Sequence, residues 1–225
     1  MKEILQQGQY GLSQEGENIL EGFVYSDAIK IYDDQFVINN LEPIVTTLNN
    51  FIDYESSLEI GSGNGSLSWL INKIKPNNKT VCLDINKDVA SYKYYKNVDF
   101  FITRTDEYFK LTEDNDKYFK FDLILSFEHF EHIAPNKLNI LGENLLNHSK
   151  PGTIFFGSAP AYGRESTPAG LVHPNCKSKS EWDIWFYNLG FDILDFSILE
   201  NRAQYGIPPT YYDSSYTNEL FYIKK

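Results

Sequence analysis

Short apolar runs alternate with amphipathic stretches along the chain from residue 56 onward. The runs are typical of strands, because they are rich in β-branched and aromatic residues and are bounded by glycine, proline or asparagine. Between them, apolar residues recur at helical spacing. We expect strands at 57–61, 80–84, 98–102, 121–126, 152–157, 191–199 and 219–223, and helices at 65–74, 87–95, 135–147 and 180–189.

This alternation predicts a layered fold. Strands that alternate with helices form right-handed βαβ units and a parallel sheet. The mostly apolar strands fit a sheet that is covered on both faces. No helix separates the last two strands, which should therefore pair in antiparallel fashion at one edge. The expected fold is α/β, a doubly wound and mostly parallel seven-stranded sheet with an antiparallel C-terminal hairpin strand.

The first 50 residues carry a different pattern. Two amphipathic stretches, 13–23 and 34–51, indicate helices, and Pro43 should kink or split the second one. We therefore expect an N-terminal helical arm or cap over 1–44 and one doubly wound domain over 45–225. An arm of this kind can exchange between subunits, so a homodimer is one expected assembly.

Composition excludes several classes of partner. Twenty Lys and Arg against 31 Asp and Glu among 225 residues leave a net charge of −11, which disfavours binding to a nucleic-acid backbone or an anionic membrane. The chain has no apolar stretch near the ~18 residues of a membrane span, and its N-terminus lacks a signal-peptide pattern. We expect a cytoplasmic protein. Two cysteines cannot build a disulfide framework.

A glycine-rich loop, GSGNG at 61–65, lies where the first strand ends and the first helix of the sheet begins. Glycines at such a point let the backbone turn tightly and let a ligand approach main-chain atoms. Asp84 ends the next strand, about 20 residues further on, where a carboxylate can accept hydrogen bonds from both hydroxyls of a ribose. The loop and Asp84 together predict a nucleoside-containing cofactor.

Two cofactor classes share this arrangement, dinucleotides and S-adenosyl-L-methionine. Glu59 precedes the first glycine by two residues. Its carboxylate would repel a pyrophosphate but attract the ammonium group of a methionyl moiety. Gly65 also comes one residue too early for a dinucleotide loop. We therefore favour S-adenosyl-L-methionine. A nicotinamide-dependent oxidoreductase and a non-catalytic cofactor-binding protein remain the alternatives.

Four segments, in order, resemble motifs of the class I S-adenosylmethionine-dependent methyltransferases. They are the glycine-loop segment 58–65, the acid-bearing strand 81–86, the fourth-strand segment 121–133 with its Ser-Phe-Glu-His-Phe-Glu-His-Ile sequence, and the Lys-Pro-Gly-Thr turn at 150–153. The resemblance implies a Rossmann-like fold, methyl transfer as the activity and S-adenosyl-L-methionine as the cofactor.

The resemblance also implies a set of cofactor-binding residues. Glu59 should lie near the methionyl amine, Asp84 at the ribose, Ile85 on the adenine ring and Asp106 at the adenine amino group, with a helix N-cap as the alternative for Asp106. The 126–128 segment should lie beside the methionyl end. The complete set is Glu59, Gly61, Ser62, Gly63, Gly65, Asp84, Ile85, Asp106, Ser126, Phe127 and Glu128.

Histidines are the candidate groups on the acceptor side, because a hydroxyl acceptor needs a base that titrates near neutrality. His148 follows a helix near a turn, which predicts a surface position. His129 and His132 lie three residues apart just past the fourth strand. That is the sheet edge where ligands bind in open α/β folds. We expect His129 to line the acceptor site and His132 to take part in the chemistry, with a structural role as the alternative.

The same turn raises the question of a metal. Glu128, His129, Glu131 and His132 could together hold a cation. We nevertheless expect no metal, since neighbouring carboxylates and imidazoles on an exposed turn need none.

The long segment 158–176 has little predicted regular structure, and loops of that length in compact domains are usually functional. We expect it to act as a lid, with His173 as base or acceptor ligand; tethering of the loop is the alternative. His173-Pro-Asn175, followed by Trp182 and Trp185, resembles an arrangement in methyltransferases of glycan and cell-surface biosynthesis. The Asn/Asp-Pro-Pro-Tyr/Phe motif of DNA amino-methylating enzymes is absent after the fourth strand. We therefore expect methyl transfer to oxygen of a small molecule or a glycan by in-line displacement, and no nucleic-acid acceptor.

Overall fold

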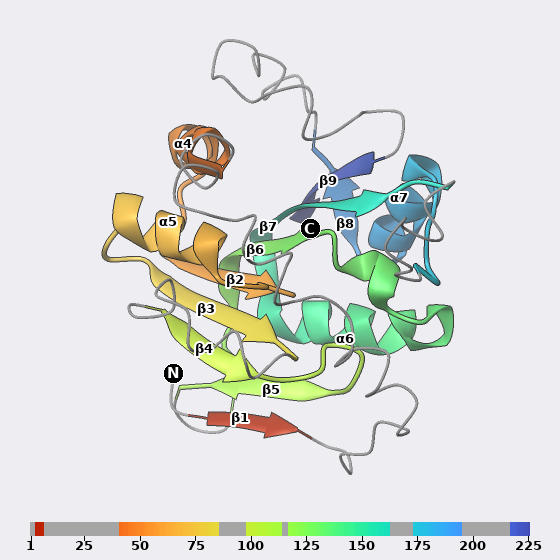
Figure 1. Ribbon diagram of the computed structural model, residues 1–225, viewed down its shortest axis with the longest axis horizontal. Coiled ribbons are helices and arrows are strands. Elements are labelled where there is room, and N and C mark those ends of the chain that lie inside the picture. Colours follow the sequence, from red (N-terminus) through yellow and green to blue (C-terminus); the bar gives the residue numbers. More distant parts are fainter. Residues whose placement is uncertain (1–2, 7–40, 86–97, 114–116, 163–172, 195–216) are drawn as a thin grey trace.

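The computed structural model describes residues 3–6, 41–85, 98–113, 117–162, 173–194 and 217–225 (Figure 1). Within these ranges the predicted sheet is present. Its strands in spatial order are β4 (Asp99–Ile102), β3 (Lys79–Asp84), β2 (Ser56–Ile60), β6 (Phe121–Phe127), β7 (Ser149–Pro160), β9 (Thr217–Lys224) and β8 (Phe191–Ile193). The first five are mutually parallel, and β9 is antiparallel to both of its neighbours. The expected fold class is confirmed.

Helices cover both faces of this sheet (Figure 1). The cluster on one face includes residues of α4 (Glu42–Phe51) and α5 (Ser66–Ile74), and the cluster on the other includes residues of α6 (Leu138–His148) and α7 (Lys179–Asn188). Successive strand residues alternate between the two clusters, because side chains point to opposite faces of a strand. On β6, Leu123 packs with the α4–α5 cluster and Ile124 with the α6–α7 cluster.

A second, two-stranded sheet was not expected. It pairs β1 (Glu3–Gln6) with β5 (Phe109–Thr112) in antiparallel fashion. The side chain of Asn144 holds β5 to α6: its Oδ1 accepts from the Phe109 N–H at 3.3 Å, and its Nδ2 donates to the carbonyls of Thr105 and Glu107. Because a strand follows Asp106, the helix N-cap reading of that residue is wrong.

The predicted surface position of His148 is also wrong. The side chain is fully buried, its ring stacks on Phe109 at 4.9 Å between centroids, and Tyr118 meets it edge-on. Nε2 accepts a hydrogen bond from the Leu111 N–H at 3.1 Å, and Nδ1 lies 2.8 Å from the Asn144 carbonyl, to which it donates. His148 is therefore a neutral imidazole that joins α6 to β5.

The N-terminal arm lies largely outside the described residues, as do the predicted helices at 13–23 and 87–95. Helix α4 begins at Glu42 and has Pro43 in its first turn, a position that proline tolerates well. The division of the chain at residue 44 stays a prediction. No helix in the described part of the chain is long and apolar enough to cross a membrane.

Candidate active site

The glycine loop turns tightly at the end of β2. Gly61, Gly63 and Gly65 have φ angles of 70°, 52° and 72°, in the left-handed region that favours glycine. The N–H groups of Gly61 and Ser62 donate to the Leu83 carbonyl at 2.9 and 3.0 Å. The loop is thereby fixed to the carboxyl end of the neighbouring strand β3, at the edge of the sheet where ligands bind in this class of fold.

Asp84 braces the same loop. Its Oδ2 accepts a hydrogen bond from the Gly63 N–H at 2.8 Å, and the residue is buried. A Cβ built on Gly63 would meet no heavy atom within 4 Å. The loop therefore has open space at its tip, directly beside a fixed carboxylate. Both features fit a cofactor that carries a ribose and lies against the backbone of the loop.

Glu59 is buried and faces α5. Its Oε2 accepts hydrogen bonds from the N–H and the hydroxyl of Ser68, at 3.1 and 2.5 Å. The pKa of the Glu59 carboxyl is raised to about 7, mainly by burial, with a smaller contribution from the nearby Asp84 charge. A positive group close to Glu59 would stabilise its charged form, which suits the ammonium group that the sequence led us to expect there.

The end of β6 contributes the 126–128 segment. The hydroxyl of Ser126 donates to the Ile60 carbonyl at 3.0 Å, and Phe127 meets Phe156 edge-on. Glu128 is exposed and has a φ of 49°. Its carboxylate accepts from the Ser158 hydroxyl at 2.8 Å. Such backbone strain at a non-glycine residue persists where the surrounding structure enforces it, often at functional sites.

His129 lies against the glycine loop. A Cβ on Gly61 would come within 2.3 Å of the imidazole Cγ, so only glycine leaves room for the ring. Nε2 lies 2.7 Å from the Thr105 hydroxyl. Burial lowers the pKa of His129 to about 4, which makes the ring neutral at pH 7. Thr105 could not be selected from the sequence, because no local pattern links it to His129, 24 residues further along the chain.

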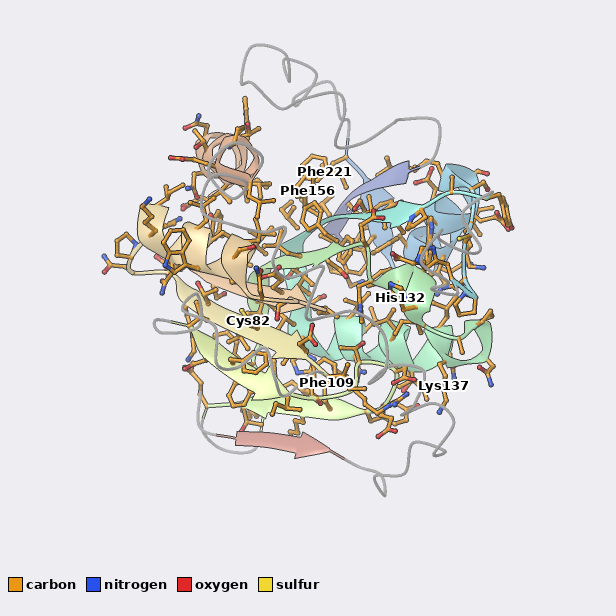
Figure 2. The ribbon with its side chains drawn as sticks, viewed as in Figure 1. Cys82, Phe109, His132, Lys137, Phe156 and Phe221 are labelled. Atoms are coloured by element: carbon orange, nitrogen blue, oxygen red, sulfur yellow. The ribbon has the colours of Figure 1, made fainter. Side chains whose placement is uncertain are left out.

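Glu131, His132 and His173 form a cluster beside the short helix η4 (Phe130–His132) that follows β6. Figure 2 labels His132, the member of the cluster at the end of this helix. One potential ligand atom from each lies within 4.8 Å of the other two. The rings of His132 and His173 are 4.8 Å apart and edge-on, and His132 Nε2 lies 3.7 Å from Glu131 Oε1. Glu131 is only 1% exposed, so the expectation of an exposed turn is wrong for this residue.

Burial dominates the electrostatics of this cluster. It raises the pKa of Glu131 well above its ordinary range, and the neighbouring Glu128 charge adds to the effect. It lowers the pKa of His132 to about 4, with a further contribution from His173. The cluster therefore contains a neutral imidazole and a carboxyl group that resists ionisation in the absence of a positive partner.

Asn175 brings His173 to this position. Its N–H donates to the Glu131 carbonyl at 3.2 Å, and its Nδ2 donates to the Phe130 carbonyl at 3.0 Å. Two hydrogen bonds from one residue thus hold the end of the 158–176 segment against η4. Residues 163–172 lie outside the described residues, so the expected lid stays a prediction.

The remaining predicted site residues lie near the ends of β3 and β4. Ile85 follows β3 and is half-buried. Asp106 forms a two-point ion pair with Arg104, with N···O distances of 2.9 and 2.7 Å. Arg104 therefore already neutralises the Asp106 carboxylate. The predicted contacts of Ile85 and Asp106 with adenine stay proposals.

Comparison with known proteins identifies the type of domain. Residues 58–155 match the family model described as a methyltransferase domain. No curated protein matches the sequence. Among solved structures, the plantazolicin methyltransferase BpumL, in complex with a triazolic desmethylPZN analog and SAH, is 15% identical with a TM-score of 0.63, over 95% of this chain and 92% of that one.

Two further structures share the fold. The 1,6-didemethyltoxoflavin-N1-methyltransferase of Burkholderia thailandensis is 15% identical with a TM-score of 0.58, over 85% of each chain. An S-adenosylmethionine-dependent methyltransferase from Clostridium acetobutylicum is 13% identical with a TM-score of 0.55, over 76% of this chain and 86% of that one.

Proposed function

We propose that the chain, whose residues 58–155 match the model of a methyltransferase domain, transfers a methyl group from S-adenosylmethionine to an oxygen atom of a small molecule or a glycan. The observation that supports oxygen as the acceptor atom is the pair of imidazoles, His132 and His173, with ring centroids 4.8 Å apart. His132 follows β6, the neighbour of the strand that ends in the glycine loop, and Asn175 holds the His173 segment beside it. Donor and acceptor groups would therefore meet at one edge of the sheet.

Residues of the glycine loop and the end of β3 would bind the cofactor. S-adenosylmethionine supplies a methyl group activated by its positively charged sulfur. The open space at Gly63 would admit the cofactor to the loop, and the Asp84 carboxylate beside it would accept hydrogen bonds from the ribose hydroxyls. Glu59 would favour the methionyl ammonium, directly or through water, since that charge would stabilise its buried carboxylate.

The acceptor side needs a group that takes a proton. An imidazole nitrogen can do so, and we assign this role to His173, with His132 packed against it. In the transfer the acceptor O–H bond breaks and its proton passes to the imidazole. The acceptor oxygen then bonds to the methyl carbon as the carbon–sulfur bond breaks, which leaves a neutral thioether. Alignment and exclusion of water are what the protein adds to this displacement.

Two neighbours with this fold act on small molecules by their names, plantazolicin and 1,6-didemethyltoxoflavin, and the second is named an N1-methyltransferase. A small-molecule acceptor is consistent with both names. Nitrogen is the competing acceptor atom. At these low identities the likeness is one of fold, so the choice of oxygen depends on the His132–His173 pair.

Methyl transfer from cofactor labelled in its methyl group tests the proposal. The acceptors offered are phenols, sugars with free hydroxyls, and amines of similar size, each with the wild-type protein and with His173→Ala. The proposal is supported if the wild-type protein transfers label to phenols or sugars and the His173→Ala variant transfers less. Label in amines alone would overturn the oxygen acceptor. Absence of S-adenosylhomocysteine binding by calorimetry would overturn the cofactor assignment.

A further inference from the structure

The cluster beside η4 contains a buried carboxylate oxygen that has no hydrogen-bond partner in the described part of the chain. Glu131 is 1% exposed, and its Oε2 makes no hydrogen bond to any described residue. An unsatisfied polar atom in a protein interior costs roughly 1–3 kcal/mol, and more when the group is charged. Native structures rarely retain such an atom unless a ligand, ion or water completes it.

The groups nearest to this carboxyl are imidazoles. His132 Nε2 lies 3.7 Å from Glu131 Oε1, and potential ligand atoms of Glu131, His132 and His173 all lie within 4.8 Å of one another. Neutral imidazole has a lone pair but no positive charge. His132, whose pKa burial lowers to about 4, therefore cannot neutralise the carboxylate as lysine or arginine would. A cation at this point would accept all three groups as ligands.

We propose that Glu131, His132 and His173 bind one divalent metal ion at the carboxyl edge of the sheet. Two imidazoles and one carboxylate form a three-ligand set that leaves at least one position open for an exogenous oxygen. Nitrogen donors select first-row cations such as Zn²⁺ over Mg²⁺ and Ca²⁺, which prefer oxygen.

The distances allow this with small side-chain movements. Ligands at about 2.0–2.2 Å from a tetrahedral ion lie roughly 3.5 Å from one another. Separations of up to 4.8 Å therefore close by rotation of the side chains, without displacement of the backbone. The backbone is already fixed, because Asn175 holds its segment to the carbonyls of Glu131 and Phe130.

Electrostatics favours the same occupant. Glu131 is buried, so little water can stabilise its carboxylate. A divalent ion bound to this oxygen would supply the missing positive charge. Glu128, whose charge acts on Glu131, adds negative potential next to the site.

For the reaction, the consequence rests on the proposed function. An acceptor hydroxyl bound at the open position would have a lowered pKa, because the cation stabilises the oxyanion that forms when the proton leaves to water. The acceptor oxygen would then bond to the methyl carbon as the carbon–sulfur bond breaks. With an ion bound, His173 would hold the ion, and water rather than the His173 imidazole would take the proton.

Calorimetric titration of the full chain with ZnCl₂, after removal of metals with a chelator, tests the site. We expect one ion per chain with a Kd in the micromolar range or tighter, and no heat from MgCl₂ at the same concentrations. Glu131→Gln keeps the shape of the side chain and should weaken Zn²⁺ binding at least tenfold, as should His173→Ala. Glu143→Gln, at an exposed glutamate on α6, should bind Zn²⁺ like the wild type.

The outcomes separate this inference from the proposed function. A wild-type protein that does not bind Zn²⁺ overturns the metal site, whatever the variants do. A folded Glu131→Gln protein with wild-type affinity overturns it as well. S-adenosylhomocysteine binding, measured on the same samples, should be unchanged by either variant. Its absence in a protein that binds Zn²⁺ would overturn the methyltransferase proposal and leave the metal site standing.

Discussion

The carboxylate of Asp84 accepts a hydrogen bond from the N–H of Gly63 at 2.8 Å. One residue thus ends β3 and fixes the tip of the loop that follows β2. The two motifs that the sequence presents separately, a glycine loop and an acid about 20 residues later, are one hydrogen-bonded unit. Any substitution of Asp84 therefore also affects the loop.

We expect Asp84→Ala to weaken S-adenosylhomocysteine binding by about 1–3 kcal/mol, because the loop loses its brace and the ribose loses a charged acceptor. Asp84→Asn keeps an acceptor for Gly63 and should have a smaller effect. Calorimetry on folded proteins measures both. Asp53→Ala removes a fully exposed carboxylate and is the control. Unchanged affinity in Asp84→Ala would remove Asp84 from the cofactor site.

Gly63→Val should abolish cofactor binding while the protein remains folded. The new side chain would project into space that is open to 4 Å, and a φ of 52° adds strain. Gly152 offers a matched control, because it too has a positive φ, at 89°, and open space around a built Cβ. Gly152→Val should lose a similar 1–2 kcal/mol of stability and keep full affinity. Equal affinities in the two variants would show that the 61–65 loop is only a turn.

Gly61→Ala should destabilise the fold, because its Cβ would lie 2.3 Å from Cγ of His129. Denaturant titration measures the loss of unfolding free energy. In a His129→Ala background the steric part of that loss disappears, and only the strain of a φ near 70° remains. A double-mutant cycle separates the two contributions. Strictly additive effects would mean that the ring does not occupy this space.

We expect the folded protein to lose stability in mild acid because of His148. Burial lowers its pKa to about 4 in the folded protein, with Lys120 also disfavouring the charged form. The unfolded chain, with a histidine pKa near 6.5, binds more protons between these values, so stability is complete above about pH 6.5 and is lost as the pH falls toward 4. The difference amounts to about 2 kcal/mol between pH 7 and pH 5.

Urea unfolding of the wild type and His148→Gln at both pH values isolates this contribution. The variant should be less stable at pH 7, since its glutamine replaces an imidazole that pairs with the Leu111 N–H, and it should lose about 2 kcal/mol less than the wild type on acidification. Parallel pH profiles of the two proteins would contradict the assignment.

Local periodicity accounts for the elements that could be predicted from the sequence. The strands near the glycine loop and β6 are continuous apolar runs. From these runs the strands could be predicted, with bounds within a residue of those in the structure. β5 could not be found in this way. It has four residues, and its partner β1 lies more than 100 residues away in the sequence. The burial of His148 could not be predicted for a related reason. Phe109 and Tyr118, which cover its ring, lie 30 or more residues earlier in the chain.

The candidate site shows the same division. The glycine loop, Asp84 and the β6 end could be predicted, because each sits at a recognisable strand end. The meeting of Glu131 with His173 could not. It depends on the hydrogen bonds of Asn175 to η4, which join residues about 45 positions apart, and no spacing in the sequence encodes them.

The position of β9 has a consequence for synthesis of the chain. β9 lies between β7 and β8, although both of those strands precede it in the sequence. While the ribosome adds residues up to 216, the edge of β7 that β9 will cover has unpaired N–H and C=O groups along most of its length. Such an edge can pair with another nascent chain. Completion of the sheet therefore waits for residues 217–224, and truncation before them should yield an aggregating product rather than a smaller folded one.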